Sequence, residues 1–369
     1  MTRVSATLGI QASYLYTPTA LLVSFDGPEQ ERTKLLRVDA GQADLGKLFE
    51  FDDALERLED GRESLQAAGE RIERIASAGA RFPVLLSAAA GGLASASATV
   101  FFGGGLLEVC LAAGLGLLIF CLGRGLSRLN GGGNLLEAIA GFTAALLSIL
   151  FAATVYPIDD RLVTLGAIIV LLPGLAFTVA MTELATHHLS SGVARLAGAG
   201  VVFLTLAVGV ALAWRLGAGL RPATIHVIAL PQWSQWIALA VAPFAFSILL
   251  QARRRQWPVI CAVAWSGFLA AKWGGAVMGS EFGAFFGALM IGVLSNLYAR
   301  WRDRPAMVPQ VPAILILVPG SIGYRAVTAF LDQDALAGVG FAFSMSLIAV
   351  SIVGGLLAAN ALAPPRRVL

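Results

Sequence analysis

Residues 311–330 read VPAILILVPGSIGYRAVTAF, an apolar segment long enough to cross a membrane that is interrupted by Pro319-Gly320. A second segment, residues 162–183 (LVTLGAIIVLLPGLAFTVAMTE), carries the same dipeptide as Pro173-Gly174, 146 positions earlier (319 minus 173). About 20 apolar residues span the ~30 Å hydrocarbon layer of a bilayer. Proline lacks an N–H and clashes with the carbonyl four residues earlier, so it kinks or breaks a helix. The two segments therefore predict two membrane helices, each broken near its middle.

The composition of the whole chain agrees with a membrane protein. Hydrophobic residues make up 57% of the 369 positions and charged residues only 13%, whereas about a quarter of the residues in a soluble domain are charged. The net charge of +3 lies in short loops between apolar segments, so it does not indicate nucleic-acid binding. We predict an all-α polytopic membrane protein with ten transmembrane helices near 83–102, 106–123, 134–155, 162–183, 194–213, 234–251, 258–274, 282–299, 311–330 and 336–358.

The acidic residues gather ahead of these segments, in a part of the chain that predicts a small soluble α/β domain. Short β-prone runs separated by the turn residues Asp26-Gly27-Pro28 are followed by segments with helical spacing. The predicted strands are Tyr14–Tyr16, Thr19–Phe25 and Thr33–Val38, and the predicted helices are Asp44–Glu59 and Glu63–Ala78. The predicted domains are residues 1–81 (cytoplasmic), 82–215 (first five-helix repeat) and 216–369 (second five-helix repeat).

The placement of basic residues predicts the orientation. With a cytoplasmic N-terminus, the loops on the inner side carry eleven arginines, against three arginines and one lysine outside. This excess follows the positive-inside rule. The start of the chain has no apolar core followed by a small-residue cleavage site, so we expect both termini in the cytoplasm.

Three features recur at nearly one offset. Besides the Pro-Gly pairs, Thr182 and Thr328 are 146 positions apart, and Glu137 and Glu281 are 144 apart. Two sets of five crossings follow, and an odd number of crossings inverts the second set in the membrane. Inverted repeats are a common transporter architecture. Chance recurrence of Pro-Gly in apolar sequence is the alternative.

The broken helices supply the predicted binding site. A helix that begins inside the bilayer presents free N–H groups and the positive end of its dipole, which suit a carboxylate. A broken backbone is tolerated in a membrane where it lines a cavity. A packing kink is the alternative for the prolines, and bonding back to helix carbonyls is the alternative for the hydroxyls. The substrate-binding candidates are Pro173, Gly174, Thr178, Thr182, Pro319, Gly320, Tyr324, Arg325 and Thr328.

Ionisable side chains inside apolar spans are costly, at about 2.5–3.5 kcal/mol on insertion scales, so each one is a functional candidate. The basic candidates are Lys272 and Arg325. Arg325 could clamp a substrate carboxylate with two hydrogen bonds. Placement at the membrane interface is the alternative for the carboxylates at span ends. The proton-coupling candidates are Glu183, Glu137, Glu281 and Glu108.

The sequence resembles the threonine/serine exporter family over nearly its whole length. The resemblance rests on Tyr16-Thr17-Pro18-Thr19 with Leu21–Phe25, on Arg81-Phe82-Pro83, on Phe101-Phe102-Gly103-Gly104, on Gly279-Ser280-Glu281-Phe282 with Asn296, and most strongly on Val318-Pro319-Gly320-Ser321-Ile322-Gly323-Tyr324-Arg325. It implies a ten-span inner-membrane protein with a cytoplasmic N-terminal domain that exports threonine and serine by using the proton gradient. Related two-subunit systems are associated with succinate export.

The sequence therefore predicts a secondary exporter rather than an enzyme, with a small amino acid as substrate. A dicarboxylate such as succinate is the alternative substrate, and a passive channel is the alternative class. The expected partners are the substrate, the proton and the lipid bilayer, with a homo-oligomer as a further option. No cofactor, metal or nucleic acid is expected.

Overall fold

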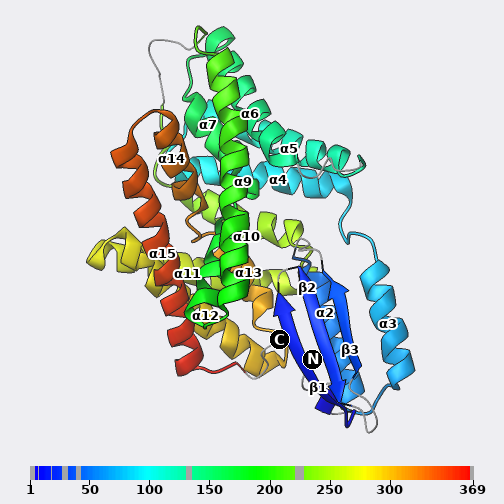
Figure 1. Ribbon diagram of the computed structural model, residues 1–369. Helices are drawn as coiled ribbons and strands as arrows, with labels where there is room; N and C mark the ends of the chain where they lie inside the picture. The colour runs from blue at the N-terminus through cyan, green and yellow to red at the C-terminus, as the bar shows by residue number, and fades with distance from the viewer. Residues whose placement is uncertain are drawn as a thin grey trace.

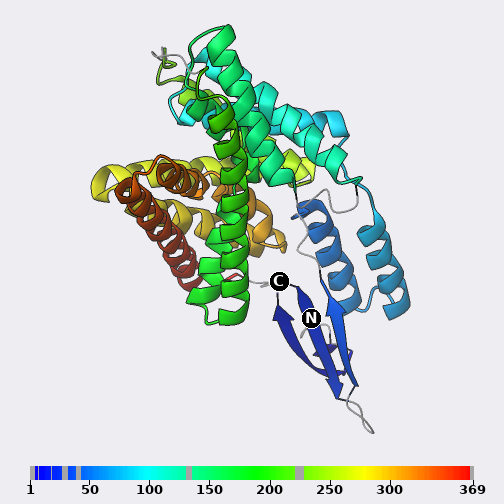
Figure 2. The same ribbon diagram turned by 45° about the horizontal axis from the view of Figure 1, so that its top comes forward.

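A computed structural model of the chain describes residues 5–6, 8–17, 19–26, 32–38, 43–129, 135–220 and 228–365. A large helical body carries a small unit at one end, made of one sheet and two helices (Figures 1 and 2). The sheet is an antiparallel meander in the order β1-β2-β3. Its strands are β1 (Gln11–Thr17), β2 (Ala20–Asp26) and β3 (Arg32–Arg37).

The N-terminal unit has the elements that the sequence predicts. The two helices after the sheet are α2 (Leu45–Glu59) and α3 (Leu65–Ser77). Each begins at a polar residue whose side chain accepts a hydrogen bond from a free backbone N–H, Asp44 for α2 and Ser64 for α3, which is the usual way to start a helix. The turn residues Gly27 and Pro28 lie outside the described residues.

Within the residues that the structure describes, seven helices are long and apolar enough to cross a membrane, and an eighth span results if one bent pair counts as a single crossing. The protein is therefore a multi-pass membrane protein. The long helices are α4 (Val84–Phe101), α5 (Leu106–Leu126), α6 (Leu136–Thr154), α9 (Leu189–Leu216), α11 (Trp257–Met278), α12 (Ser280–Arg302) and α15 (Ala335–Leu362).

The expectation of ten full spans is met only in part, and proline is the main reason. The predicted fourth span consists of α7 (Asp160–Ala167), a 3₁₀ turn at Ile169–Leu171 and α8 (Gly174–Ala185), with a bend of 50°. The predicted ninth span is divided into α13 (Met307–Ile314) and α14 (Gly320–Leu331).

The predicted sixth span falls short for a different reason. It is α10 (Ser234–Leu249), which has 16 residues and contains Pro243. At 1.5 Å per residue this helix is about 24 Å long, less than the ~30 Å of a typical hydrocarbon layer.

Contacts define two ends of the helical body. At the near end, which carries the sheet, Arg304 after α12 pairs with Asp53 of α2, and α9 contacts β1. At the far end, Arg161 of α7 pairs with Asp332, the residue that ends α14. Trp214, near the end of α9, lies under the Arg161 guanidinium. Helices α7 and α8 therefore lead from the far end to the near end, whereas α13 and α14 lead from the near end to the far end.

Helices of equal length recur in the two parts of the body. Both α8 and α14 have 12 residues, and both α9 and α15 have 28. The first residues of each pair are 146 positions apart (320 minus 174, and 335 minus 189). The turns that join them match as well, because His187 and Gln333, also 146 apart, have φ values of 63° and 62°. This agreement extends the offset from two prolines to some 40 consecutive residues.

Candidate functional site

The two helix breaks meet each other inside the body. A Cβ atom placed on Gly174 would lie only 2.8 Å from the backbone nitrogen of Gly320, so the two backbones are in direct contact. Pro173 and Pro319, which precede these glycines, have nearly the same backbone angles, with φ of −80° and −83° and ψ of 36° and 31°. The first turns of α8 and α14 thus lie side by side. Their free N–H groups create a region of positive potential at the contact.

A cavity of about 470 Å³ adjoins this contact. Residues of α4, α10, α11, α12, α14 and α15, of the α13–α14 break and of the turn before α8 line it. Ile169 and Leu315 line this cavity, and they lie four positions before Pro173 and Pro319. Because proline has no N–H, the carbonyls of these two residues lack the donor that a regular helix would provide. The polar side chains on its wall are Ser97, Gln235, Lys272, Ser280 and Ser321. The volume suits a small metabolite.

None of the nine substrate-binding residues predicted from sequence is among the residues that line this cavity. The Pro-Gly pairs lie at the contact behind its wall, and Ser321, the next residue of α14, faces it. The hydroxyls of Thr178, Thr182 and Thr328 bond back to carbonyls of their own helices, three or four residues earlier. For these threonines the structure favours bonding back to helix carbonyls, which was the alternative to substrate binding.

Tyr324 and Arg325 lie farther along α14. Tyr324 is 4% exposed and belongs to the main apolar core. The Arg325 side chain is exposed, and its guanidinium carbon lies 5.8 Å from the ring centre of Phe102, which itself lines the cavity. Arg325 therefore contacts the back of the cavity wall, and the cation that lines the cavity is Lys272.

The four carboxylates proposed for proton coupling have different surroundings. Glu183 makes an ion pair with Arg195 at the near end, with 3.0 Å between Oε1 and Nη2. Glu281 accepts a hydrogen bond from Ser280, and Glu137 lies partly buried in the first turn of α6. Glu108 differs from these three.

Glu108 is 2% exposed, in the first turn of α5. Its Oε1 atom is buried and has no hydrogen-bond partner among the described residues. Burial and the missing partner distinguish Glu108 from the other three candidate carboxylates.

At the far end, an ion pair between Arg161 and Asp332 joins the two parts of the body. The two terminal guanidinium nitrogens of Arg161, Nη1 and Nη2, donate to the carboxylate of Asp332, and the Nη2–Oδ1 distance is 3.0 Å. The same guanidinium lies 4.5 Å above the ring of Trp214. A planar guanidinium can make both contacts at once. Sequence patterns do not predict this pair, because its members are 171 positions apart.

The near end is fastened by α2. The N–H of Leu45 donates to the carbonyl of Leu250, and the Leu45 side chain packs with Ile260 of α11 and Val311 of α13. Asp53 accepts hydrogen bonds from Arg57 and Arg304. Burial would raise the pKa of Asp53, but these hydrogen bonds and the two positive charges outweigh it and hold the pKa below its usual value.

Broken helices that meet beside a cavity are typical of helical membrane transporters. Comparison with known families names the family. The threonine/serine exporter model matches residues 1–217, and a second model, described as threonine/serine exporter, ThrE, matches residues 235–362. The chain therefore belongs to the threonine/serine exporter family.

The chain is also similar to fungal proteins named pheromone-regulated membrane protein 10. It is 25% identical to that of Eremothecium gossypii over 99% of this chain and 53% of the relative, and 25% identical to that of Saccharomyces cerevisiae over 98% and 50%. The Candida albicans relative is 26% identical over 88% and 31%. The chain thus spans about half or less of the length of these relatives. No solved structure matches it.

Proposed function

We propose that this protein is a secondary exporter of a small amino acid, with threonine and serine as the first substrates to test. The observation that carries the proposal is the contact of the two Pro-Gly breaks beside a cavity of about 470 Å³. Two helix N-termini attract the substrate carboxylate, and the serine hydroxyls and Gln235 on the wall offer hydrogen bonds to its polar groups.

We further propose that the body consists of two inverted repeats of five helices. Equal helix lengths at one offset support this arrangement, and so do the opposite directions of α7–α8 and α13–α14. Residues 82–215 and 216–369 would be the repeats, with residues 1–81 as a cytoplasmic domain. Both chain ends would face the cytoplasm of a cell whose inner membrane holds the protein.

Transport would follow from alternating access. In this proposal the halves rock about the Gly174–Gly320 contact, and the Arg161–Asp332 pair closes the far end in one of the two states. Glu108 would take up a proton from outside and release it to the cytoplasm, so that the proton gradient supplies the energy for export. Lys272, on the cavity wall, would bind a carboxylate, and Arg325 would support the wall through Phe102.

The test is efflux from proteoliposomes that contain the purified full chain, loaded with labelled threonine, serine or succinate under an imposed pH gradient. We expect efflux of threonine and serine that saturates with concentration and stops when the gradient is dissipated. Selective efflux of succinate would assign the alternative substrate, and a dicarboxylate would use Lys272 and the helix N-termini together. Equal, non-saturating loss of all three solutes would identify a channel and overturn the proposal.

Two variants separate the roles of the cations. Lys272→Gln should reduce threonine efflux at least tenfold, since a charged hydrogen bond contributes about 1.5–3 kcal/mol. Arg325→Ala should abolish export by loosening Phe102, while the protein still inserts. Arg128→Gln is the control, because Arg128 is exposed and does not line the cavity. Normal transport by both cavity variants would remove this cavity from the pathway.

A further inference from the structure

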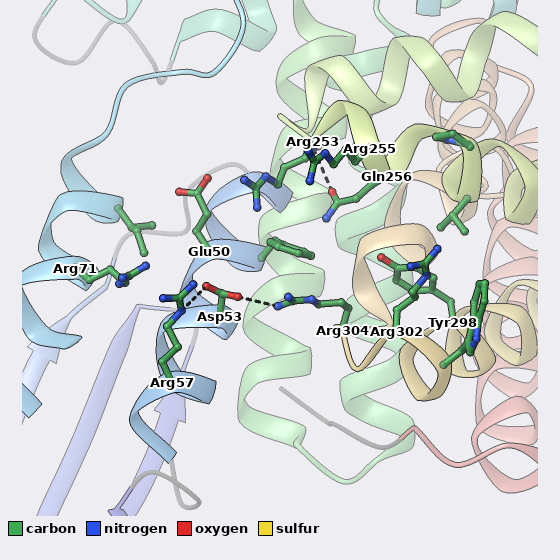
Figure 3. A pocket seen from close by; sticks show the side chains of 15 residues that line it. Glu50, Asp53, Arg57, Arg71, Arg253, Arg255, Gln256, Tyr298, Arg302 and Arg304 are labelled. Carbon is green, nitrogen blue, oxygen red and sulfur yellow. Dashed lines mark hydrogen bonds and ion pairs between the residues drawn. The ribbon is translucent and has the colours of Figure 1, made fainter. Parts of the chain in front are cut away.

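A second and larger cavity, of about 960 Å³, lies where the N-terminal unit meets the helical body. Helices α2 and α3 form one side of it, and the turn before α11 and the end of α12 form the other. Figure 3 shows arginine side chains reaching into this space from both sides. The six arginines on its wall are Arg57, Arg71, Arg253, Arg255, Arg302 and Arg304, against only two carboxylates, Glu50 and Asp53.

Both carboxylates are already engaged. Glu50 pairs with Arg81, which lies outside the cavity wall, and Asp53 pairs with Arg57 and Arg304. Arg71 is held by Glu63 at 3.1 Å. Within the cavity the positive charge is therefore in excess.

Three arginines carry that excess. Within the described part of the chain, Arg253, Arg255 and Arg302 have no carboxylate within ion-pair distance. Arg253 lies 5.0 Å from the Phe49 ring centre, and Arg302 lies 4.5 Å from that of its neighbour Trp301. Guanidinium groups that are spread over aromatic faces keep their N–H edges available for a further acceptor.

Gln256 provides an independent sign of a missing partner. It is 5% exposed, and its Oε1 accepts the N–H of Arg253, which fixes the amide. Its Nε2 is buried and has no hydrogen-bond partner among the described residues, although Gln256 lines the cavity. A buried N–H donor without an acceptor is costly. An acceptor-rich anion in the cavity would satisfy it.

We propose that this cavity binds an anion that carries phosphate. Phosphate matches the available donors because its several oxygens accept forked hydrogen bonds from arginine. The anion would touch Arg255 and Arg302 on the membrane side and approach α3 on the soluble side, so it would join the N-terminal unit to the second half of the body. A dissolved phosphorylated metabolite and a phospholipid head group share this chemistry.

The assay uses the purified full chain in nanodiscs of neutral lipid, titrated with pyrophosphate in a calorimeter at constant ionic strength. We expect saturable binding that weakens at least tenfold in the double variant Arg255→Gln/Arg302→Gln. Among the described residues these two arginines have no ion-pair partner to lose, so the variant should fold. Arg254→Gln is the matched control, because Arg254 lies in the same turn and is exposed but does not line the cavity; it should change the affinity less than twofold.

Nanodiscs that contain an anionic phospholipid distinguish the two sources. If the lipid suppresses pyrophosphate binding to the wild type, the head group is the occupant; if binding persists, the occupant is a dissolved anion. Either result supports a phosphate site. An equal loss in Arg254→Gln, equal affinity for succinate, or no saturable binding would overturn it.

Hydrogen exchange tests the bridging role separately. Pyrophosphate should slow exchange in Leu65–Ser77 of α3 as well as in the turn at Arg253–Gln256. Slower exchange on the membrane side alone would refute the link between the two parts. Neither measurement depends on transport, so failure here leaves the proposed export untouched.

Discussion

Gly174 and Gly320 are buried and touch each other, yet they tolerate a side chain unequally. A Cβ on Gly174 would lie 2.8 and 2.9 Å from backbone atoms of Gly320, whereas one on Gly320 would lie no closer than 3.2 Å to any atom. We expect Gly174→Ala to destabilise the protein by about 1–3 kcal/mol, as overpacking does, and to abolish efflux. Gly320→Ala should reduce both stability and efflux by a smaller amount.

Gly114→Ala is the control for this comparison, since no atom lies within 4 Å of its Cβ position. Thermal unfolding in detergent and efflux from proteoliposomes give the two readouts. If Gly174→Ala transported like Gly114→Ala, the contact between the breaks would have no role in function.

Glu108 allows a residue-level test of the coupling step. Glu108→Gln keeps the shape of the side chain but cannot exchange a proton, so we expect gradient-driven efflux to fall at least tenfold while threonine–threonine exchange continues. Glu281→Gln, also at the start of a helix, should retain driven efflux. Loss of exchange in Glu108→Gln would instead indicate a structural role.

At the scale of elements, α2 is the part whose docking depends on pH. The pKa of Asp53 is lowered from 3.8 by its arginine partners. The ionised Asp53 carboxylate therefore stabilises the docked position of α2 fully above pH 3.8, and this stabilisation is lost as the pH falls through the folded-state pKa. We expect hydrogen exchange of α2 to be constant from pH 5 upward and to accelerate only in more acidic solution, after correction for intrinsic rates. Asp53→Asn should accelerate exchange at neutral pH.

Asp60→Asn is the matched control for that experiment, because Asp60 pairs only with Arg62 at the exposed end of α2 among the ion pairs of the described residues. Similar exchange in the two variants at neutral pH would mean that the Asp53–Arg304 contact does not hold α2 in place.

The elements were predictable where the cause is local. Proline acts on the turn that contains it, so Pro173 and Pro319 revealed both breaks, and apolar length revealed the long helices. The cavity wall was not predictable, since nothing within α11 indicates that Lys272 faces a cavity while Arg325 lies behind a wall. That difference depends on how distant helices pack, and the periodicity of a single apolar segment does not specify it.

At the scale of the whole molecule, the Arg161–Asp332 pair decides how firmly the two parts hold together at the far end. The residues are 49% and 35% exposed, so solvent screens the attraction and we expect only about 1 kcal/mol from it. Charge reversal in Arg161→Glu turns attraction into repulsion. We therefore expect the far end to open, with a shift of roughly fivefold or more in the populations of the two states.

Spin labels at Val155, after α6, and at Leu336, at the start of α15, report the opening, because both are exposed and belong to different parts of the body. Their distance distribution should gain a longer component in Arg161→Glu. Adding Asp332→Arg restores opposite charges in exchanged positions and should return the distribution to that of the wild type. An unchanged distribution in Arg161→Glu would show that the apolar contacts around Trp214 alone keep the far end closed, and alternating access would then need a different gate.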